Sequence, residues 1–274
     1  MGVTKLMKEM LNKVTNAGRI DLRAEAARRS TPLLLACDKN SFIFWLNDRG
    51  CLKTKQQAPD CIQNLTFGGQ YQELAERTEW VLNCLKSANI ELVIVSDGPR
   101  PYFKNAAGFD GRTAPYEPSK GLWDALLTNP LGSFTSAVVP SHSTLQTMTC
   151  DSVFEKMQLK QIKLFREADP VVVAVAKQND CFAVLSNDSD FFVMEDAPRF
   201  IPLNKLEIPS TDPNGPILAH VFSKQDVARL LGLRDVKLLP AFGALVGNDI
   251  TKDSGFLKMI TGGVTTGSGL MEKV

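Results

Sequence analysis

The chain has 274 residues, which is enough for one large α/β domain or for one domain with an added subdomain. Its hydrophobic fraction of 44% and charged fraction of 22% are ordinary for a globular protein, so extended disorder is not expected. The net charge of +1 provides no overall attraction for nucleic acid, so any phosphate-binding surface has to be local.

Residues 1–30 are locally basic, with seven Lys or Arg against three acids. This segment is either a solvated helix face or a surface that meets phosphates, and both interpretations remain open. The segment lacks the apolar stretch of a signal peptide, and no run of 18 apolar residues predicts a membrane span. Six cysteines without a Cys-x-x-Cys pair and two histidines argue against zinc and favour an intracellular protein, of nucleus or cytoplasm.

Short apolar runs that end in acids or turn residues predict buried strands. They cover Thr31–Asp38, Glu91–Gly98, Gln161–Phe165, Cys181–Asp190 and Arg199–Leu203. Helical spacing and caps predict helices between and after them. These cover Tyr71–Ala88, Asp169–Gln178, Gln225–Leu231 and Val236–Val246. The alternation predicts an α/β fold with a central, mostly parallel sheet flanked by helices. Asn47–Gln70 and Asn105–Cys150 fall outside this pattern.

Acids stand where the predicted strands and the last helix end, in five separate segments. They are Asp38, Asp97, Glu167, Asp169, Asp188, Asp190 and Asp249. Because the carboxyl ends of parallel strands share one edge of a sheet, these carboxylates are expected to converge. Such a cluster calls for hard divalent cations with oxygen ligands, Mg²⁺ or Mn²⁺, and predicts a site for two ions. The alternative is that each acid is a turn former or a helix cap.

The segment Glu167–Asp190 resembles the internal motif of flap endonucleases and xeroderma pigmentosum G (XPG)-type nucleases, within the PIN-like superfamily. Its acid-x-acid start, apolar helix, apolar strand and closing Asp-x-Asp match that motif without a gap. The strand before Asp38 and the Asp97-Gly98 strand end resemble other motifs of the family, as do Leu245–Asp249 and the opening Met1-Gly2-Val3.

Within the superfamily, three stretches look most like the Asteroid and constitutive-coactivator-of-PPAR-gamma branch. They are Ser30–Trp45, Asn89–Lys104 and Phe242–Ile250. The resemblance implies a PIN-like nuclease domain over about 1–250 and a Gly/Thr/Ser-rich tail over 251–274. Within the domain it implies an XPG N-terminal-like part (1–104), an arch-like insert (105–150) and an XPG internal-like part (151–250).

The resemblance also implies roles for residues outside the acid set. Lys104 would stabilise charge on the scissile phosphate, and Phe44 would stack on a base. Candidate nucleic-acid-binding residues are Gly2, Phe44, Arg100, Lys104 and Arg112. The alternatives are a solvated surface lysine for Lys104 and a core aromatic for Phe44.

Two segments depart from the flap-endonuclease pattern. The arch-like insert has only two basic residues, Arg112 and Lys120, so it would attract the phosphates of a nucleic-acid strand only weakly. It is instead a candidate surface for a protein partner. The tail lacks the second helix of the duplex-gripping motif, so single-stranded or flap-like ends are favoured.

The sequence thus predicts a Mg²⁺- or Mn²⁺-dependent endonuclease or exonuclease that hydrolyses phosphodiester bonds of DNA or RNA. The seven acids and Lys104 are its candidate catalytic residues. The alternative is a catalytically silent PIN-like module that binds nucleic acid or acts as a scaffold in RNA or gene regulation. A hydrolase or transferase acting on a small phosphorylated molecule is a third interpretation.

Overall fold

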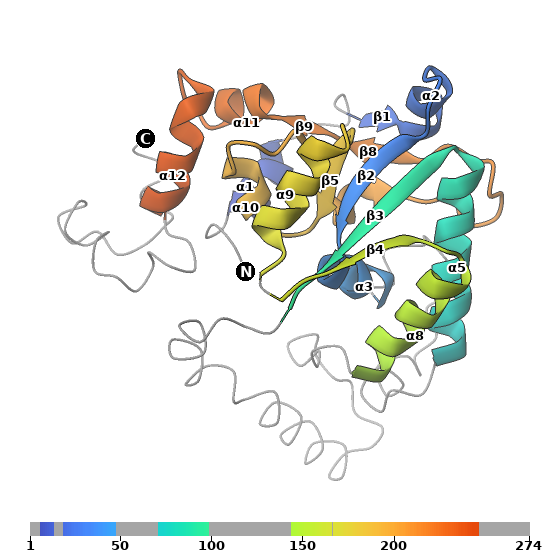
Figure 1. Ribbon diagram of the computed structural model, residues 1–274. Coiled ribbons are helices and arrows are strands. Elements are labelled where there is room, and N and C mark those ends of the chain that lie inside the picture. The colour runs from blue at the N-terminus through green and yellow to red at the C-terminus, as the bar shows by residue number, and fades with distance from the viewer. Residues whose placement is uncertain (1–5, 14–18, 48–70, 99–143, 166, 247–274) are drawn as a thin grey trace, which may run out of the picture.

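The computed structural model describes residues 6–13, 19–47, 71–98, 144–165 and 167–246. A six-stranded sheet lies at the centre, in the order β4-β3-β2-β5-β6-β9 (Figure 1). Its strands are β2 (Leu33–Asp38), β3 (Ile90–Ser96), β4 (Lys160–Lys163), β5 (Ala183–Ser186), β6 (Arg199–Pro202) and β9 (Phe222–Ser223). The first five strands of that order pair in parallel and β9 pairs antiparallel with β6, which confirms the predicted mostly parallel sheet.

The order of the strands creates a switch point between β2 and β5. From β2 the chain moves outward to β3 and then β4, and it returns to place β5 on the other side of β2 before continuing to β6. Connections therefore leave the adjacent strands β2 and β5 in opposite directions. In open α/β sheets, the crevice at such a point, beyond the carboxyl ends of the strands, is where ligands bind.

Helices cover both faces of this sheet. Their bounds are α1 (Leu6–Lys13), α2 (Leu22–Ala27), α3 (Lys39–Asn47), α5 (Tyr71–Ser87), α8 (Thr144–Lys156), α9 (Asp169–Gln178), α10 (Asp190–Val193), α11 (Lys224–Leu230) and α12 (Leu239–Val246). Figure 1 shows α3, α5 and α8 grouped on one side of the sheet and α9, α10 and α12 on the other. None of the described helices is long and apolar enough to cross a membrane.

Each face of the sheet has its own hydrophobic core. On β2, Leu35 and Cys37 belong to the core beneath α3, α5 and α8, whereas Ala36 belongs to the core beneath α9 and α10. This alternation follows from the two-residue period of a strand. A parallel strand that is buried on both faces reads as a continuous apolar run, and this is why the run before Asp38 identified β2.

A second, antiparallel sheet of three short strands was not predicted. It has the order β1-β8-β7, with β1 (Arg19–Asp21), β7 (Leu206–Glu207) and β8 (Leu218–His220). Asp21 also caps α2, because its Oδ1 accepts a hydrogen bond from the backbone N of Arg23 at 3.0 Å.

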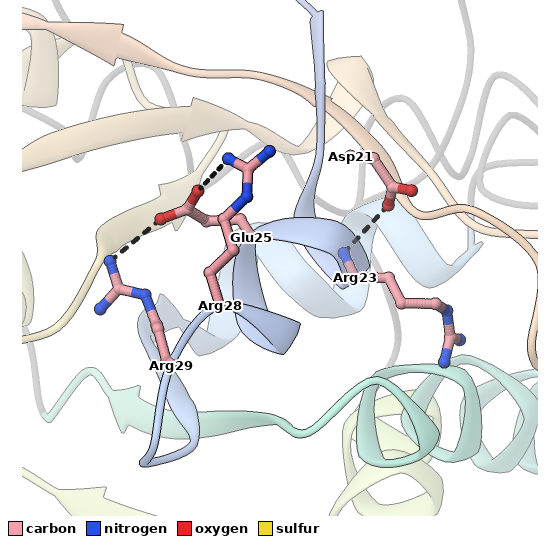
Figure 2. Close-up of polar contacts among 5 residues, drawn as sticks. All are labelled: Asp21, Arg23, Glu25, Arg28 and Arg29. Atoms are coloured by element: carbon pink, nitrogen blue, oxygen red, sulfur yellow. Dashed lines mark hydrogen bonds and ion pairs between the residues drawn. The ribbon is translucent and has the colours of Figure 1, made fainter.

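The described arginines of the basic N-terminal segment are engaged within the chain. Figure 2 shows Glu25 of α2 between Arg28 and Arg29, which it contacts at 3.4 and 3.3 Å. Arg19 of β1 pairs with Glu207 of β7 at 2.5 Å. These contacts pair the three arginines with acids of the chain, and the two interpretations of the segment stay open.

A helix begins where none was expected from the sequence, and another helix is divided. The helix α8 begins at Thr144, inside the segment 105–150, and packs against α5. The helix expected over Val236–Val246 is divided into a 3-10 turn, η4 (Val236–Leu238), and α12. Asp235 caps that turn by accepting from the backbone N of Lys237 at 2.9 Å. A further 3-10 turn, η3 (Leu203–Lys205), follows β6.

Candidate metal centre

Six of the seven predicted acids lie where the strands of the parallel sheet end. Asp38 is the last residue of β2, and Asp97 directly follows β3. Glu167 lies between β4 and α9, and Asp169 is the first residue of α9; Asp188 lies between β5 and α10, and Asp190 is the first residue of α10. Four segments that are distant in sequence therefore bring carboxylates to one edge, at the switch point between β2 and β5.

Asp169, Asp188 and Asp190 form the tightest group. One carboxylate oxygen of each lies within 4.8 Å of those of the other two, and all three side chains are partly buried. Oxygen ligands from carboxylates are those preferred by Mg²⁺ and Mn²⁺. This group therefore has the donor chemistry and the spacing to hold a divalent cation.

The pKa values of the group show mutual repulsion. Burial and then the charges of the surrounding carboxylates, Asp188 first among them, raise the pKa of Asp169 to about 8. Burial raises the pKa of Asp188 to about 6; the backbone N–H of Asp190 opposes this rise, and the Asp190 charge adds to it. In both cases a buried carboxylate resists ionisation among like charges. A bound divalent cation would relieve that repulsion, so the residues fit the metal that the sequence predicts.

Asp97 stands beside this group and bridges two elements. Its Oδ1 accepts from the backbone N of Ala168 at 2.6 Å, directly before α9, and its Oδ2 accepts from Asn40 Nδ2 of α3 at 2.7 Å. Burial raises the pKa of Asp97, and the neighbouring Asp38 and Glu167 charges add to the rise, although these two hydrogen bonds oppose it. The contacts tie the end of β3 to the beginning of α9.

A pair of hydroxyl groups holds the carboxylate of Asp38. Its Oδ2 accepts from Ser41 Oγ at 2.5 Å and from Ser186 Oγ at 3.0 Å, and the two hydroxyls lie 2.9 Å apart. Its Oδ1 accepts from the backbone N of Asn40 at 3.0 Å. Asp38 and Ser186 are buried, so the orientation of this carboxylate is set by the protein.

Sequence reasoning missed Asn40, Ser41 and Ser186. Asn40 and Ser41 follow Asp38 by two and three residues, a spacing at which acids commonly accept hydrogen bonds at a helix start. Ser186 ends the apolar run of β5, and its partner across the sheet is set by the β2–β5 pairing. Asn40 and Ser41 thus had a local sequence signal, whereas the contact of Ser186 with Asp38 depends on tertiary structure.

The side chain of Phe44 is half-exposed, with 50% of its surface accessible. Its neighbours Phe42 and Trp45 on α3 are buried and stacked, with ring centroids 5.6 Å apart. Phe44 is thus not the core aromatic of the alternative interpretation, and its contact with a base stays a prediction.

Five predicted site residues lie outside the described residues. They are Gly2, Arg100, Lys104, Arg112 and Asp249. Their roles stay predictions, as do the individual ligand roles of the six acids at the sheet edge.

Comparison with known proteins places these observations in context. No protein-family model matches the chain. Over 172 residues it is 26% identical to the protein named single-strand DNA endonuclease ASTE1 of Danio rerio, a match that covers 56% of this chain and 24% of that protein. The chain thus spans about a quarter of the length of this curated relative.

The fold is that of a solved nuclease core, and a second solved structure is similar to a lesser degree. The catalytic core of Rad2 in complex with DNA substrate has a TM-score of 0.50 and 13% identity, covering 91% of this chain and 62% of that one. Human GEN1 in complex with Holliday junction DNA has a TM-score of 0.48 and 14% identity, covering 99% and 57%. The sequence match to ASTE1 bears out the resemblance to the XPG-type nucleases and their Asteroid branch that the motifs predict, and the Rad2 match shows that the fold is shared.

Proposed function

We propose that this chain is a Mg²⁺- or Mn²⁺-dependent nuclease that hydrolyses phosphodiester bonds of DNA or RNA, on single-stranded or flap-like ends. The observation that carries the proposal is the meeting of six carboxylates at the switch point of the sheet, three of them with oxygens within 4.8 Å of one another. The endonuclease name of the similar Danio rerio protein supports the same reaction.

Asp169, Asp188 and Asp190 would hold one ion, and Asp38, Asp97 and Glu167 would hold or orient a second. Asp249 would complete this set, and Lys104 would stabilise charge on the phosphate, both by resemblance. When bound, the two ions would supply a water activated for attack and positive charge for the leaving oxygen.

The chain's own polar groups would keep the carboxylates in place during this chemistry. Ser41 and Ser186 hold Asp38, and Asn40 joins Asp97 to the start of α3. Such preorganisation lets charged groups act without rearranging as the phosphate's charge develops.

The proposed domain is the PIN-like unit over about 1–250, and its proposed partner is nucleic acid. The segment 105–150 is the proposed surface for a protein partner; of this segment the structure describes α8 from Thr144. The proposed compartment is intracellular, the nucleus or the cytoplasm.

The test is a cleavage assay on end-labelled single-stranded DNA, single-stranded RNA and a 5′ flap. Each substrate is incubated with Mg²⁺, with Mn²⁺ and with EDTA, using wild type and an Asp188→Asn/Asp190→Asn double variant. We expect cutting by wild type that requires metal and is lost in the variant, because the variant removes two of the three closest carboxylates.

Asp180→Asn is the matched control. Asp180 is exposed, stands three residues before β5 at the opposite edge of the sheet, and has a φ of 49° that asparagine adopts readily. It should cut like wild type. If wild type and the double variant are equally inactive with every substrate and metal, while both still bind nucleic acid, the chain is instead a silent binding module.

A further inference from the structure

Phe165 is an exposed aromatic side chain in the segment that leads from β4 to the acids Glu167 and Asp169. It is 94% exposed, whereas every other described phenylalanine except Phe44 is buried. It stands two residues before Glu167, beyond the carboxyl end of β4. Single exposed apolar side chains are common on proteins, so its position matters more than its exposure.

The backbone on both sides of Phe165 is anchored. The backbone N of Leu164 donates to Ser96 O at 3.3 Å, which extends the β3–β4 pairing by one residue. The backbone N of Ala168 donates to Asp97 Oδ1 at 2.6 Å. Leu164 also packs against the core beneath α9. The exposed ring therefore lies between two anchored stretches of backbone, one of which bonds to Asp97 of the candidate metal centre.

The two exposed phenylalanines stand in segments that follow β2 and β4, at the edge of the sheet where the carboxylates lie. Phe44 lies on α3, which begins directly after Asp38 at the end of β2, and Phe165 follows β4. In the sheet, β3 lies between β2 and β4, and the residue that follows β3 is Asp97. A strand with a phosphate at these acids would pass this edge of the sheet, where the segments that carry both phenylalanines lie.

We propose that Phe165 stacks on an unpaired nucleobase of the strand whose phosphate lies at the carboxylates. The inference rests on the proposed function and adds a base-binding position to it. The ring is uncharged, and aromatic stacking accepts every base, so the contact would recognise a single strand without reading its sequence. A base that is stacked within a duplex has no free face on which the Phe165 ring could stack.

The test measures the Kd of short, fluorescein-labelled single-stranded DNA by anisotropy, with Ca²⁺ in place of Mg²⁺ to limit cleavage. A series of strands carries one abasic site, moved stepwise along the sequence. Phe165→Ala should bind the intact strand at least about fivefold more weakly than wild type. For wild type, an abasic site at one position of the strand should weaken binding by a similar factor. On that strand, wild type and Phe165→Ala should bind with the same Kd.

Two controls separate stacking from general effects. Phe165→Trp keeps an aromatic face and should retain the affinity of wild type. Leu145→Ala removes another exposed apolar side chain, on α8, and should leave affinity unchanged. All variants should have the same Tm as wild type, because these side chains add little to the core.

Equal affinity of wild type and Phe165→Ala, or an equal loss by Phe165→Ala on every strand of the series, would overturn the inference. If wild type cleaves and the inference is overturned, the proposed function still stands. If wild type binds and does not cleave with any metal, the proposed function fails, and the abasic series still decides the role of Phe165.

Discussion

The hydroxyl of Ser186 binds a carboxylate of the candidate metal centre, at 3.0 Å from Asp38 Oδ2. A hydrogen bond to a charged group contributes about 1.5–3 kcal/mol, and here it also sets the direction of the carboxylate. We therefore expect Ser186→Ala to lower the cleavage rate by about tenfold and to raise the Mn²⁺ concentration needed for half-maximal activity. The measurement is a titration of the cleavage rate with Mn²⁺.

Ser87→Ala provides the comparison for that variant. Ser87 also donates a hydrogen bond, to Cys84 O at 2.9 Å, but it ends α5, away from the acids. It should lower Tm without changing the Mn²⁺ requirement. A normal Mn²⁺ titration for Ser186→Ala would show that this hydroxyl is dispensable for holding Asp38.

The raised pKa of Asp169 predicts how stability depends on pH. Its pKa increases from an ordinary 3.8 to about 8, so the folded state retains a proton that the unfolded state releases between these values. The contribution of Asp169 to the free energy of unfolding is therefore complete below the unfolded-state pKa and is lost as pH rises through the folded-state pKa. In EDTA, we expect the Tm of wild type to fall across this range.

Asp169→Asn removes that proton linkage. At about pH 8 in EDTA, the variant should be more stable than wild type by at least about 1 kcal/mol, because it holds no charge among the other acids. Added Mn²⁺ should stabilise wild type more than the variant, because cation binding requires the ionised carboxylate. Parallel Tm curves for the two proteins in EDTA would contradict the linkage.

At the scale of elements, those with a strong local signal could be predicted. The helix α9 has the expected bounds, Asp169–Gln178, and α11 has the expected capping box of Ser223 and Asp226. The helix α3 was not predicted, because its apolar residues crowd together in Phe42–Leu46 without a clear period. The strands of the small sheet have only two or three residues, which is too short to show alternation.

The residues of the candidate site likewise divide into those with a local sequence signal and those without one. The acids could be predicted because each directly follows a strong strand signal, and parallel topology then brings them to one edge. Their supporting contacts depend on tertiary structure. The four-residue helix α10, which begins at Asp190, is supported by Lys224 Nζ, which donates to Phe191 O at 2.8 Å and to Phe192 O at 3.2 Å. Partial burial lowers the pKa of Lys224 to about 8, and no sequence pattern indicated this partly buried lysine.

At the scale of the whole molecule, Arg23 joins segments that are distant in sequence. From α2, its Nη2 donates to Ser87 Oγ of α5 at 3.0 Å and to Pro213 O at 2.6 Å, and its Nε donates to Gly215 O at 3.0 Å. These contacts connect the region of the small sheet to a helix on the large one. The sequence showed only a basic segment and could not indicate which of its arginines has this role.

Replacing Arg23 should therefore cost far more stability than replacing a nearby surface arginine. Arg23→Met leaves part-buried carbonyl oxygens without their charged donor, so we expect a loss of about 2–4 kcal/mol in the free energy of unfolding. Arg28→Met should cost about 0.5 kcal/mol or less, because Arg28 is 77% exposed and only pairs with Glu25 at 3.4 Å (Figure 2). Urea unfolding followed by circular dichroism measures both. Similar midpoints for the two variants would mean that the Arg23 contacts contribute no more than a surface ion pair, and that apolar packing alone holds α2 against α5.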